Sequence, residues 1–153
     1  MQARDQKSLE AVVRLERKGF RISSRVTADD TDCAEHSYGQ VQEFFRTHPC
    51  MALFRALIEV RDRRRNVVLM AVAWVEMPDA DSAGDFKRLV DRHGSGNITE
   101  LSRERGRYRD VRFTGDIYKS GRDSEIVVNA QAQPVHRGVG AAALAEIVQA
   151  AVR

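Results

Sequence analysis

Apolar residues recur at helical spacing in two segments near the start of the chain. In residues 6–18 the recurring apolar positions are Leu9, Val12, Val13 and Leu15. Gly19 then stands where a helix of that length would end. A second stripe, with one apolar residue every three or four positions, is formed by Ala34, Tyr38, Val41 and Phe45. Both stripes predict amphipathic helices that bury one face.

The second of these helices has signals at both ends. Asp32 is followed three residues later by Glu35, the capping-box spacing at which two side chains satisfy backbone N–H groups of the first turn. Pro49 ends the helix, because the residue before a proline is kept out of the α-helical region. We therefore expect a helix that fills residues 34–47.

The pattern changes from helical to alternating between residues 51 and 77. One face of the first strand is formed by Phe54, Ala56, Ile58 and Val60. The polar turn "RDRRRN" follows, and Val67–Val75 is then apolar on both faces, as in a central strand. This order predicts a long hairpin, followed by a helix that begins near Asp79 and ends near Gly94.

The second half of the chain repeats this plan. After the loop "GSGN", residues 99–105 are expected to form one or two helical turns. Alternating apolar residues then predict a strand over 111–118, a turn at "SGRD" and a partner strand over 126–132. A final helix is expected from about Gly138 to Val152.

These elements follow the order α-α-ββα-α-ββα. Four antiparallel strands with half-apolar faces need a cover on one side, and the helices supply it. The sequence thus predicts an α+β fold: a two-layer sandwich in which a four-stranded antiparallel sheet of two hairpins carries helices on one face. We expect residues 1–28 to form an N-terminal helix and connector, and residues 29–153 to form a single α+β domain.

The face of the sheet turned away from the helices is predicted to be polar. Its candidate side chains, which combine a charge, a phenol and two amides, are Arg112, Tyr118, Asn129 and Gln131. Such a face either meets water or forms a polar platform. The strand Val67–Val75 leaves room for a homodimer if helices cover only one side of the sheet.

Composition and charge narrow the function. The chain has 153 residues, of which 42% are hydrophobic and 31% charged, a composition typical of a folded domain. No stretch approaches the roughly 20 apolar residues of a membrane-spanning helix. Much of the basic charge lies in two arginine clusters, residues 61–65 and 103–112, but acidic residues alternate with those arginines and the formal net charge is only +3. A nucleic-acid or other polyanionic partner is therefore the weaker hypothesis.

The segment "VHRGVGAAALAEIVQA", which begins at Val135, joins a strand to a helix through a glycine turn. Backbone N–H groups at such a turn, together with the helix dipole, can bind an anion. The segment resembles the acyl-coenzyme-A pyrophosphate loop of GNAT-type acetyltransferases at its two glycines, and departs from it at Val135, where that family has Gln or Arg. The resemblance implies a coenzyme-A-dependent acyltransferase as an alternative function. The anion-binding turn would consist of His136, Arg137, Gly138 and Gly140.

The position of this turn favours a simpler interpretation. The chain after Gly140 is long enough for one helix, whereas the acetyltransferase fold adds further strands that build the acceptor side of the site. We therefore expect the two glycines to serve a tight strand-to-helix turn that closes the fold.

The two cysteines, Cys33 and Cys50, bracket the second predicted helix. If residues 34–47 were all helical, they would rise by about 21 Å, whereas bonded cysteines need Cα atoms within about 7 Å. A disulfide therefore requires a shorter helix whose flanks fold back along it. A catalytic pair between Cys50 and His48 or His36 stays open as an alternative.

A second resemblance bears on these cysteines. The segments "DCAEHSYGQVQEFFRTHPC", "VVLMAVAWVEMPD", "GSGNITEL" and "VVNAQAQPV" resemble a group of uncharacterised actinobacterial proteins. In that group a Cys–Tyr-Gly–Pro-Cys segment precedes two hairpins, and many members are secreted or membrane-anchored. The resemblance implies a bridge between Cys33 and Cys50 and an extracytoplasmic domain with an anchor ahead of Met1. It brings no activity with it.

The sequence contains no convergent catalytic set. It lacks the Gly-x-Ser-x-Gly, His-Glu-x-x-His and Cys-x-x-Cys motifs. The acidic residues 29–36 lack the spacing of a calcium loop and are interpreted as capping and solvated groups. We therefore expect a non-enzymatic domain that binds a protein or small molecule, without a cofactor or metal. The alternatives are the acyltransferase and a basic module that binds anions or nucleic acid.

Overall fold

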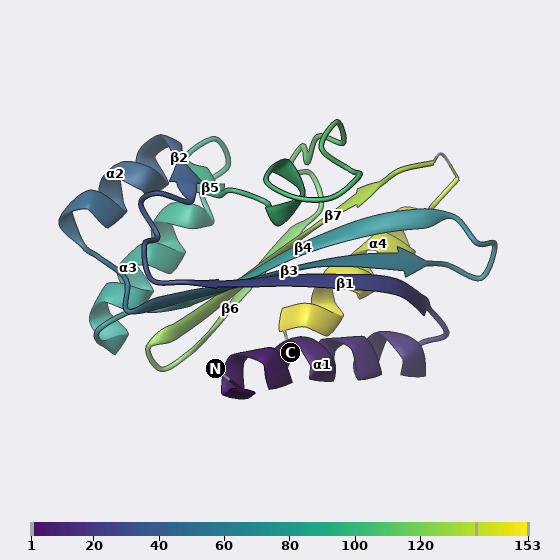
Figure 1. The fold of residues 1–153 in the computed structure, drawn as a ribbon, viewed down its shortest axis with the longest axis horizontal. Helices are drawn as coiled ribbons and strands as arrows, with labels where there is room; N and C mark the ends of the chain where they lie inside the picture. The colour runs from purple at the N-terminus through teal and green to yellow at the C-terminus, as the bar shows by residue number, and fades with distance from the viewer. Residues whose placement is uncertain (1, 137, 153) are drawn as a thin grey trace.

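The chain forms an antiparallel sheet with helices on both faces (Figure 1). The computed structural model describes residues 2–136 and 138–152, with residues 2–4 described by their backbone. Its helices are α1 (Gln2–Arg17), α2 (Gly39–Thr47), α3 (Ala80–Val90), the 3-10 turn η1 (Leu101–Arg103) and α4 (Ala141–Val152). Its strands are β1 (Arg21–Asp30), β2 (Ser37–Tyr38), β3 (Ala52–Arg61), β4 (Val67–Glu76), β5 (Gly96–Ile98), β6 (Tyr118–Asp123) and β7 (Ile126–Pro134).

The main sheet has five strands in the order β1-β3-β4-β7-β6, and each neighbouring pair is antiparallel. A separate two-stranded sheet joins β2 and β5. The α+β class and the antiparallel sheet predicted from the sequence are confirmed. The predicted number of four strands is corrected to five in the main sheet, because β1 was not anticipated.

β1 lies at the edge of the sheet, and its sequence explains why the pattern did not reveal it. It pairs with β3 from Arg21, opposite Arg61, to Asp30, opposite Leu53. Its residues, RISSRVTADD, are mostly polar, as is common where an edge strand must avoid pairing with other chains. The expected domain boundary between residues 28 and 29 falls inside this strand.

Both faces of the sheet are covered, whereas the sequence predicted helices on one. In Figure 1, α1 and α4 lie side by side along the first face, and α2 and α3 lie over one end of the second. The first core is built on side chains such as Leu15, Phe54, Ile58, Met70, Trp74 and Ile147. The second contains Phe45, Leu53, Val75, Phe86 and Val127. Because Val67–Val75 is buried on both sides within one chain, this strand has no uncovered face for the expected dimer contact.

The second hairpin begins later in the chain than predicted. Residues 111–117 form a loop, and Gly115, with φ +81, interrupts the extended run. Val111 and Phe113 pack instead against a cluster on the second face of the sheet that includes Leu69. The letters "SGRD" belong to β6, and the turn follows at Ser124, with φ 57. The apolar alternation was real, but it reflects packing of loop side chains rather than strand pairing.

α2 is shorter than the predicted helix over residues 34–47. Residues 33–36 form a turn in which the Glu35 N–H donates to the Asp32 carboxylate at 3.1 Å, so Asp32 caps this turn. Tyr38 lies in β2, and the helix begins at Gly39. The flanks of the shortened helix fold back, and Cys33 and Cys50 form a disulfide with Cα atoms 6.0 Å apart.

Removal of this disulfide should lower the stability of the fold. The bond joins residues 17 positions apart, and closing such a loop restricts the unfolded chain by about 3 kcal/mol. We expect the Cys33→Ser/Cys50→Ser variant to lose about 2–4 kcal/mol of unfolding free energy in urea titrations. Reductant should destabilise the wild type to the same extent, and the unfolded, unreduced protein should release no free thiol. Equal stability of the oxidised and reduced protein would contradict this role.

Candidate functional site

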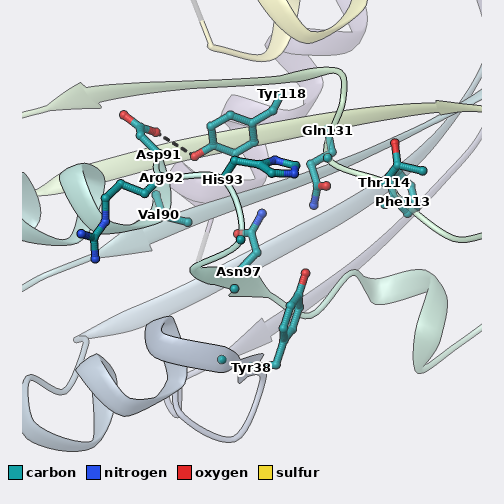
Figure 2. Close-up of a pocket in the computed structure, with 14 residues that line it drawn as sticks. Tyr38, Val90, Asp91, Arg92, His93, Asn97, Phe113, Thr114, Tyr118 and Gln131 are labelled. Atoms are coloured by element: carbon teal, nitrogen blue, oxygen red, sulfur yellow. Dashed lines mark hydrogen bonds between the residues drawn. The ribbon is translucent and has the colours of Figure 1, made fainter.

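A cleft opens on the second face of the sheet, where the end of α3, the β2–β5 pair and the loop 113–115 meet. Its volume is about 450 Å³, within the range of pockets that bind small molecules. The lining side chains in Figure 2 include Tyr38, Asp91, His93, Asn97, Phe113, Tyr118 and Gln131. They come from segments spread over most of the chain, so the cleft exists only in the folded domain.

Tyr38 forms one wall of the cleft, and a close approach of two short strands places it there. β2 pairs with β5 through Tyr38 and Asn97, and a bridge between Gly39 and Gly96 extends the contact. Gly96 has φ +99, and a Cβ atom there would lie 2.1 Å from the Tyr38 carbonyl oxygen. Only glycine permits this approach. The Tyr38 side chain stays 42% exposed and points into the cleft (Figure 2).

The floor of the cleft comes from β7. In the sheet register, Gln131 lies between Ala71 on β4 and Tyr118 on β6, and Asn129 lies opposite Ala73. The two alanines are too short to cover the neighbouring amides. The hollow that they leave is covered by residues 98–101, which follow β5.

The amide of Asn97 is oriented by two hydrogen bonds. Its Oδ1 accepts from Asn129 Nδ2 at 3.2 Å and from the Ile98 N–H at 2.7 Å. The Nδ2 donor group of Asn97 is therefore left for the cleft. Gln131 is 5% exposed, and its amide contacts the Glu100 carboxylate through a hydrogen bond that favours the charged form of that group.

Asp91 and Tyr118 form a fixed polar rim. Tyr118 Oη donates to Asp91 Oδ1 at 2.9 Å, Ser120 Oγ donates to the same oxygen at 2.6 Å, and Lys87 Nζ donates to Oδ2 at 2.8 Å. Burial alone would raise the pKa of Asp91, but these hydrogen bonds hold it below its usual range. Burial, and then the bond to Asp91, raise the pKa of Tyr118 well above its usual value.

The opposite rim is the loop that contains Thr114. The Thr114 N–H donates to Gln133 Oε1 at 3.2 Å, which fixes the loop on β7. The His93 ring lies beside Gly115, where a Cβ atom would be 3.7 Å from its Cε1. Figure 2 shows this ring turned toward Gln131. The cleft therefore has aromatic groups on opposite sides of an amide floor.

A much smaller cavity lies beneath the floor and has room for about one water molecule, with a volume near 10 Å³. Glu100 borders it and is 3% exposed. Arg103 Nε donates to Glu100 Oε1 at 3.2 Å, while Oε2 has no partner among the described residues. Burial raises the pKa of Glu100, and Arg103 offsets only part of this effect. Burial, and next the charge of Glu100, raise the pKa of Tyr38, so the Tyr38 hydroxyl keeps its proton.

The far side of this cavity is formed by an ion-pair network around Arg55, which is 2% exposed. Arg55 donates to Asp30 at 3.2 Å, to Glu104 at 2.9 Å and to the Thr99 carbonyl at 3.1 Å. His36 lies 3.4 Å from Asp30 and 3.1 Å from Glu104. The acidic segment thus supplies partners to an arginine. Among the described residues no group of His, Cys, Asp or Glu is arranged to hold a metal ion.

The polar face expected from the sequence is assembled only in part. Tyr118 and Gln131 line the cleft, and Asn129 supports it from below. Arg112 is exposed on the loop and does not contribute to the lining. Tyr38 and Asn97 were missed: Tyr38 fitted an apolar helical stripe, and Asn97 lies in a segment that was interpreted as a plain loop. The glycines of "GSGN" were the available signal, since they mark a close backbone approach.

The proposed anion-binding turn lies elsewhere. Arg137 is outside the described residues, and His136 is exposed. Gly138, with φ +102, and Gly140 border a separate cavity of about 600 Å³ at the start of α4, together with basic residues that include Arg63. β7, which leads into the turn, is antiparallel to both of its neighbours. The described sheet therefore lacks the pair of diverging parallel strands between which the acetyltransferase loop lies.

Several arginines of the two basic clusters are engaged within the domain. Arg61 and Arg107 contact the carboxylate of Glu59 at 3.2 and 2.8 Å, and Glu59 is 2% exposed. Burial alone would raise the pKa of Glu59, but hydrogen bonds from Tyr108 and Arg107 hold it below its usual range. Part of the basic charge thus stabilises buried carboxylates.

Fold and cleft together define an α+β domain with a central antiparallel sheet and a polar, aromatic-walled cleft on one face. Comparison with protein-family models, curated proteins and solved structures finds no match to this chain. Within residues 2–136 and 138–152, no helix combines the length and apolar character needed to cross a membrane.

Substitution at Gly96 should displace the Tyr38 wall. Gly96→Ala puts its Cβ atom 2.1 Å from a backbone oxygen, whereas Gly94→Ala, at φ +88, meets nothing within 4 Å. Both variants carry a left-handed backbone strain of about 1–2 kcal/mol, so their difference reports the clash. We expect Gly96→Ala to be destabilised by about 2 kcal/mol more than Gly94→Ala in urea unfolding. Equal losses would show that the β2–β5 approach is not required.

Glu100 should make the domain less stable as pH rises. Because the pKa of Glu100 is raised in the folded state, the folded protein binds the Glu100 proton more tightly than the unfolded chain does. The stability that this proton contributes is lost as pH increases through the folded-state pKa. The unfolding free energy of Glu100→Gln relative to the wild type should therefore increase between about pH 4 and about pH 8. Each tenfold difference in proton affinity between the folded and unfolded states is worth about 1.4 kcal/mol.

Glu104→Gln is the matched control for this experiment. Hydrogen bonds from Arg55, outweighing burial, and from His36 lower the pKa of Glu104, so this variant should lose stability relative to the wild type as pH rises. Urea unfolding at several pH values measures both trends. If the stabilities of both variants relative to the wild type changed in the same direction with pH, the raised pKa of Glu100 would be contradicted.

Proposed function

We propose that this chain is a non-enzymatic domain that binds a small molecule in the cleft beside Tyr38. The observation that carries the proposal is the cleft itself, a cavity of about 450 Å³ lined by the Tyr38 phenol and by the amides of Asn97 and Gln131. The printed hydrogen bonds of Asn97 use only its oxygen, and a buried donor left without a partner costs about 1–3 kcal/mol. The direction of Gln131 toward the cavity in Figure 2 supports a ligand as a further partner of its amide.

The state of the ionisable rim supports binding rather than proton transfer. General acid–base catalysis works best with a group whose pKa lies near the working pH. The pKa of Asp91 is below and that of Tyr118 above their usual values. Both residues therefore keep a constant protonation state near neutral pH and act as a rigid edge for a bound molecule.

We further propose that the domain works outside the cytoplasm, as part of a secreted or membrane-associated protein. The Cys33–Cys50 disulfide supports this location, because such bonds persist in oxidising compartments. The resemblance of the cysteine segment to secreted or membrane-anchored actinobacterial proteins points in the same direction.

Replacement of the floor amide tests the binding function. Gln131→Met keeps a side chain of similar length but removes the donor and acceptor, so ligands found by NMR screening of a polar metabolite library should bind at least about tenfold more weakly. Gln149→Met on α4, across the sheet from the cleft, is the matched control and should retain wild-type affinity. Ligands whose affinity is equal in both variants, or whose signals map away from Tyr38 and Asn97, would contradict the proposal.

A further inference from the structure

The charged groups around the cleft are already paired within the domain. Both carboxylate oxygens of Asp91 accept hydrogen bonds, from Lys87 on one side and from Tyr118 and Ser120 on the other. The Arg92 guanidinium donates to Gln40 Oε1 at 3.2 Å and points away from the cavity in Figure 2. A charged ligand would thus find no counterion directed toward it by Asp91 or Arg92.

An anionic ligand would also meet an unfavourable field. Glu100 lies beneath the floor, and its Oε2 has no partner among the described residues. Burial, and next the charge of Glu100, raise the pKa of Tyr38, in keeping with the position of Glu100 close to the cleft wall. Burial of a ligand carboxylate or phosphate near this group would add like-charge repulsion to the cost of desolvation.

The groups that remain for a ligand are neutral and hydrogen-bonding. Gln131 offers both a donor and an acceptor, the Nδ2 of Asn97 offers a donor, and the Tyr38 hydroxyl offers either. Hydroxyl groups of a ligand match such a set, because each hydroxyl can donate or accept as its neighbour requires.

These polar groups are distributed around the cavity rather than along one edge. Figure 2 shows Gln131 and Asn97 at the floor, Tyr38 on one side and Thr114 on another. A flat heterocycle, with polar atoms confined to its rim, would satisfy only part of this set. A ring with hydroxyls on most of its carbons satisfies more of it, and its C–H groups can pack on the Tyr38 and Phe113 rings.

We propose that the cleft binds a neutral saccharide unit, with the Gln131 and Asn97 amides bonded to its hydroxyls and Tyr38 packed against its ring. This inference rests on the proposed binding function and adds the class of ligand. The cavity volume of about 450 Å³ suits one small molecule.

The test is an NMR titration of the whole chain that observes the side-chain NH₂ signals of Gln131 and Asn97. Probes are glucose, N-acetylglucosamine and maltose as neutral saccharides, glucuronate and glucosamine as charged analogues, and adenosine as a heterocycle, each to about 50 mM. We expect at least one neutral saccharide to shift both amide signals to saturation. Its charged analogue should bind at least about tenfold more weakly.

Two variants connect the shifts to the proposed contacts. Gln131→Met should weaken saccharide binding by about tenfold or more, whereas Gln149→Met should not. Tyr38→Ala should weaken it more than Tyr38→Phe, which retains the ring. Backbone spectra of each variant verify that the domain is folded.

The outcomes separate the ligand class from the binding function. If a charged probe or adenosine saturates the cleft and the neutral saccharides bind more weakly, the saccharide proposal fails while the binding function stands. If no probe of any class moves the Gln131 and Asn97 signals, the saccharide proposal fails. If the metabolite library also gives no ligand there, the binding function fails with it.

Discussion

The close backbone approach of β2 to β5 is the contact on which the cleft depends. Gly39 and Gly96 both have positive φ and lie too near each other for side chains. The paired strands position Tyr38 as the wall of the cleft. They also hold Asn97 against Asn129 of β7, next to the floor. Two very short strands thereby position groups from distant parts of the sequence, and the larger sheet serves as a rigid base.

The buried polar groups of the second sheet face differ in how fully they are bonded. Arg55 and Glu59 each bind two or more partners inside the domain, whereas Glu100 Oε2 has no hydrogen-bond partner among the described residues. Of the two cleft amides, Asn97 uses only its oxygen, and Gln131 contacts the Glu100 carboxylate. A purely structural polar layer would be satisfied throughout. The neutral amide groups that line the cleft suit a binding surface for an uncharged molecule.

The hydrophobic pattern predicted those helices and strands that bury a continuous apolar face in a core. The long hairpin and helices α1, α3 and α4 follow their apolar periodicity, with limits shifted by a few residues. The pattern missed β1, which is polar along its edge, and misassigned residues 111–117, whose apolar side chains pack from a loop. Of the candidate site, Tyr118 and Gln131 were found because strand alternation placed them on one face. Tyr38 was missed, because local spacing cannot show that a glycine contact delays the start of the helix to Gly39.

The disulfide and the cleft are physically linked through the same segment. Cys33 and Cys50 close the chain around β2 and α2, so the bond restrains the segment that carries Tyr38. β2 contributes only two residues to its ladder, and so short a pairing offsets little of the entropy of ordering a loop. A covalent bond that limits the loop in the unfolded and open states lowers the cost of holding Tyr38 in place. The proposed binding at Tyr38 therefore depends on the same segment that the disulfide restrains, which agrees with the proposed location of the domain where disulfides persist.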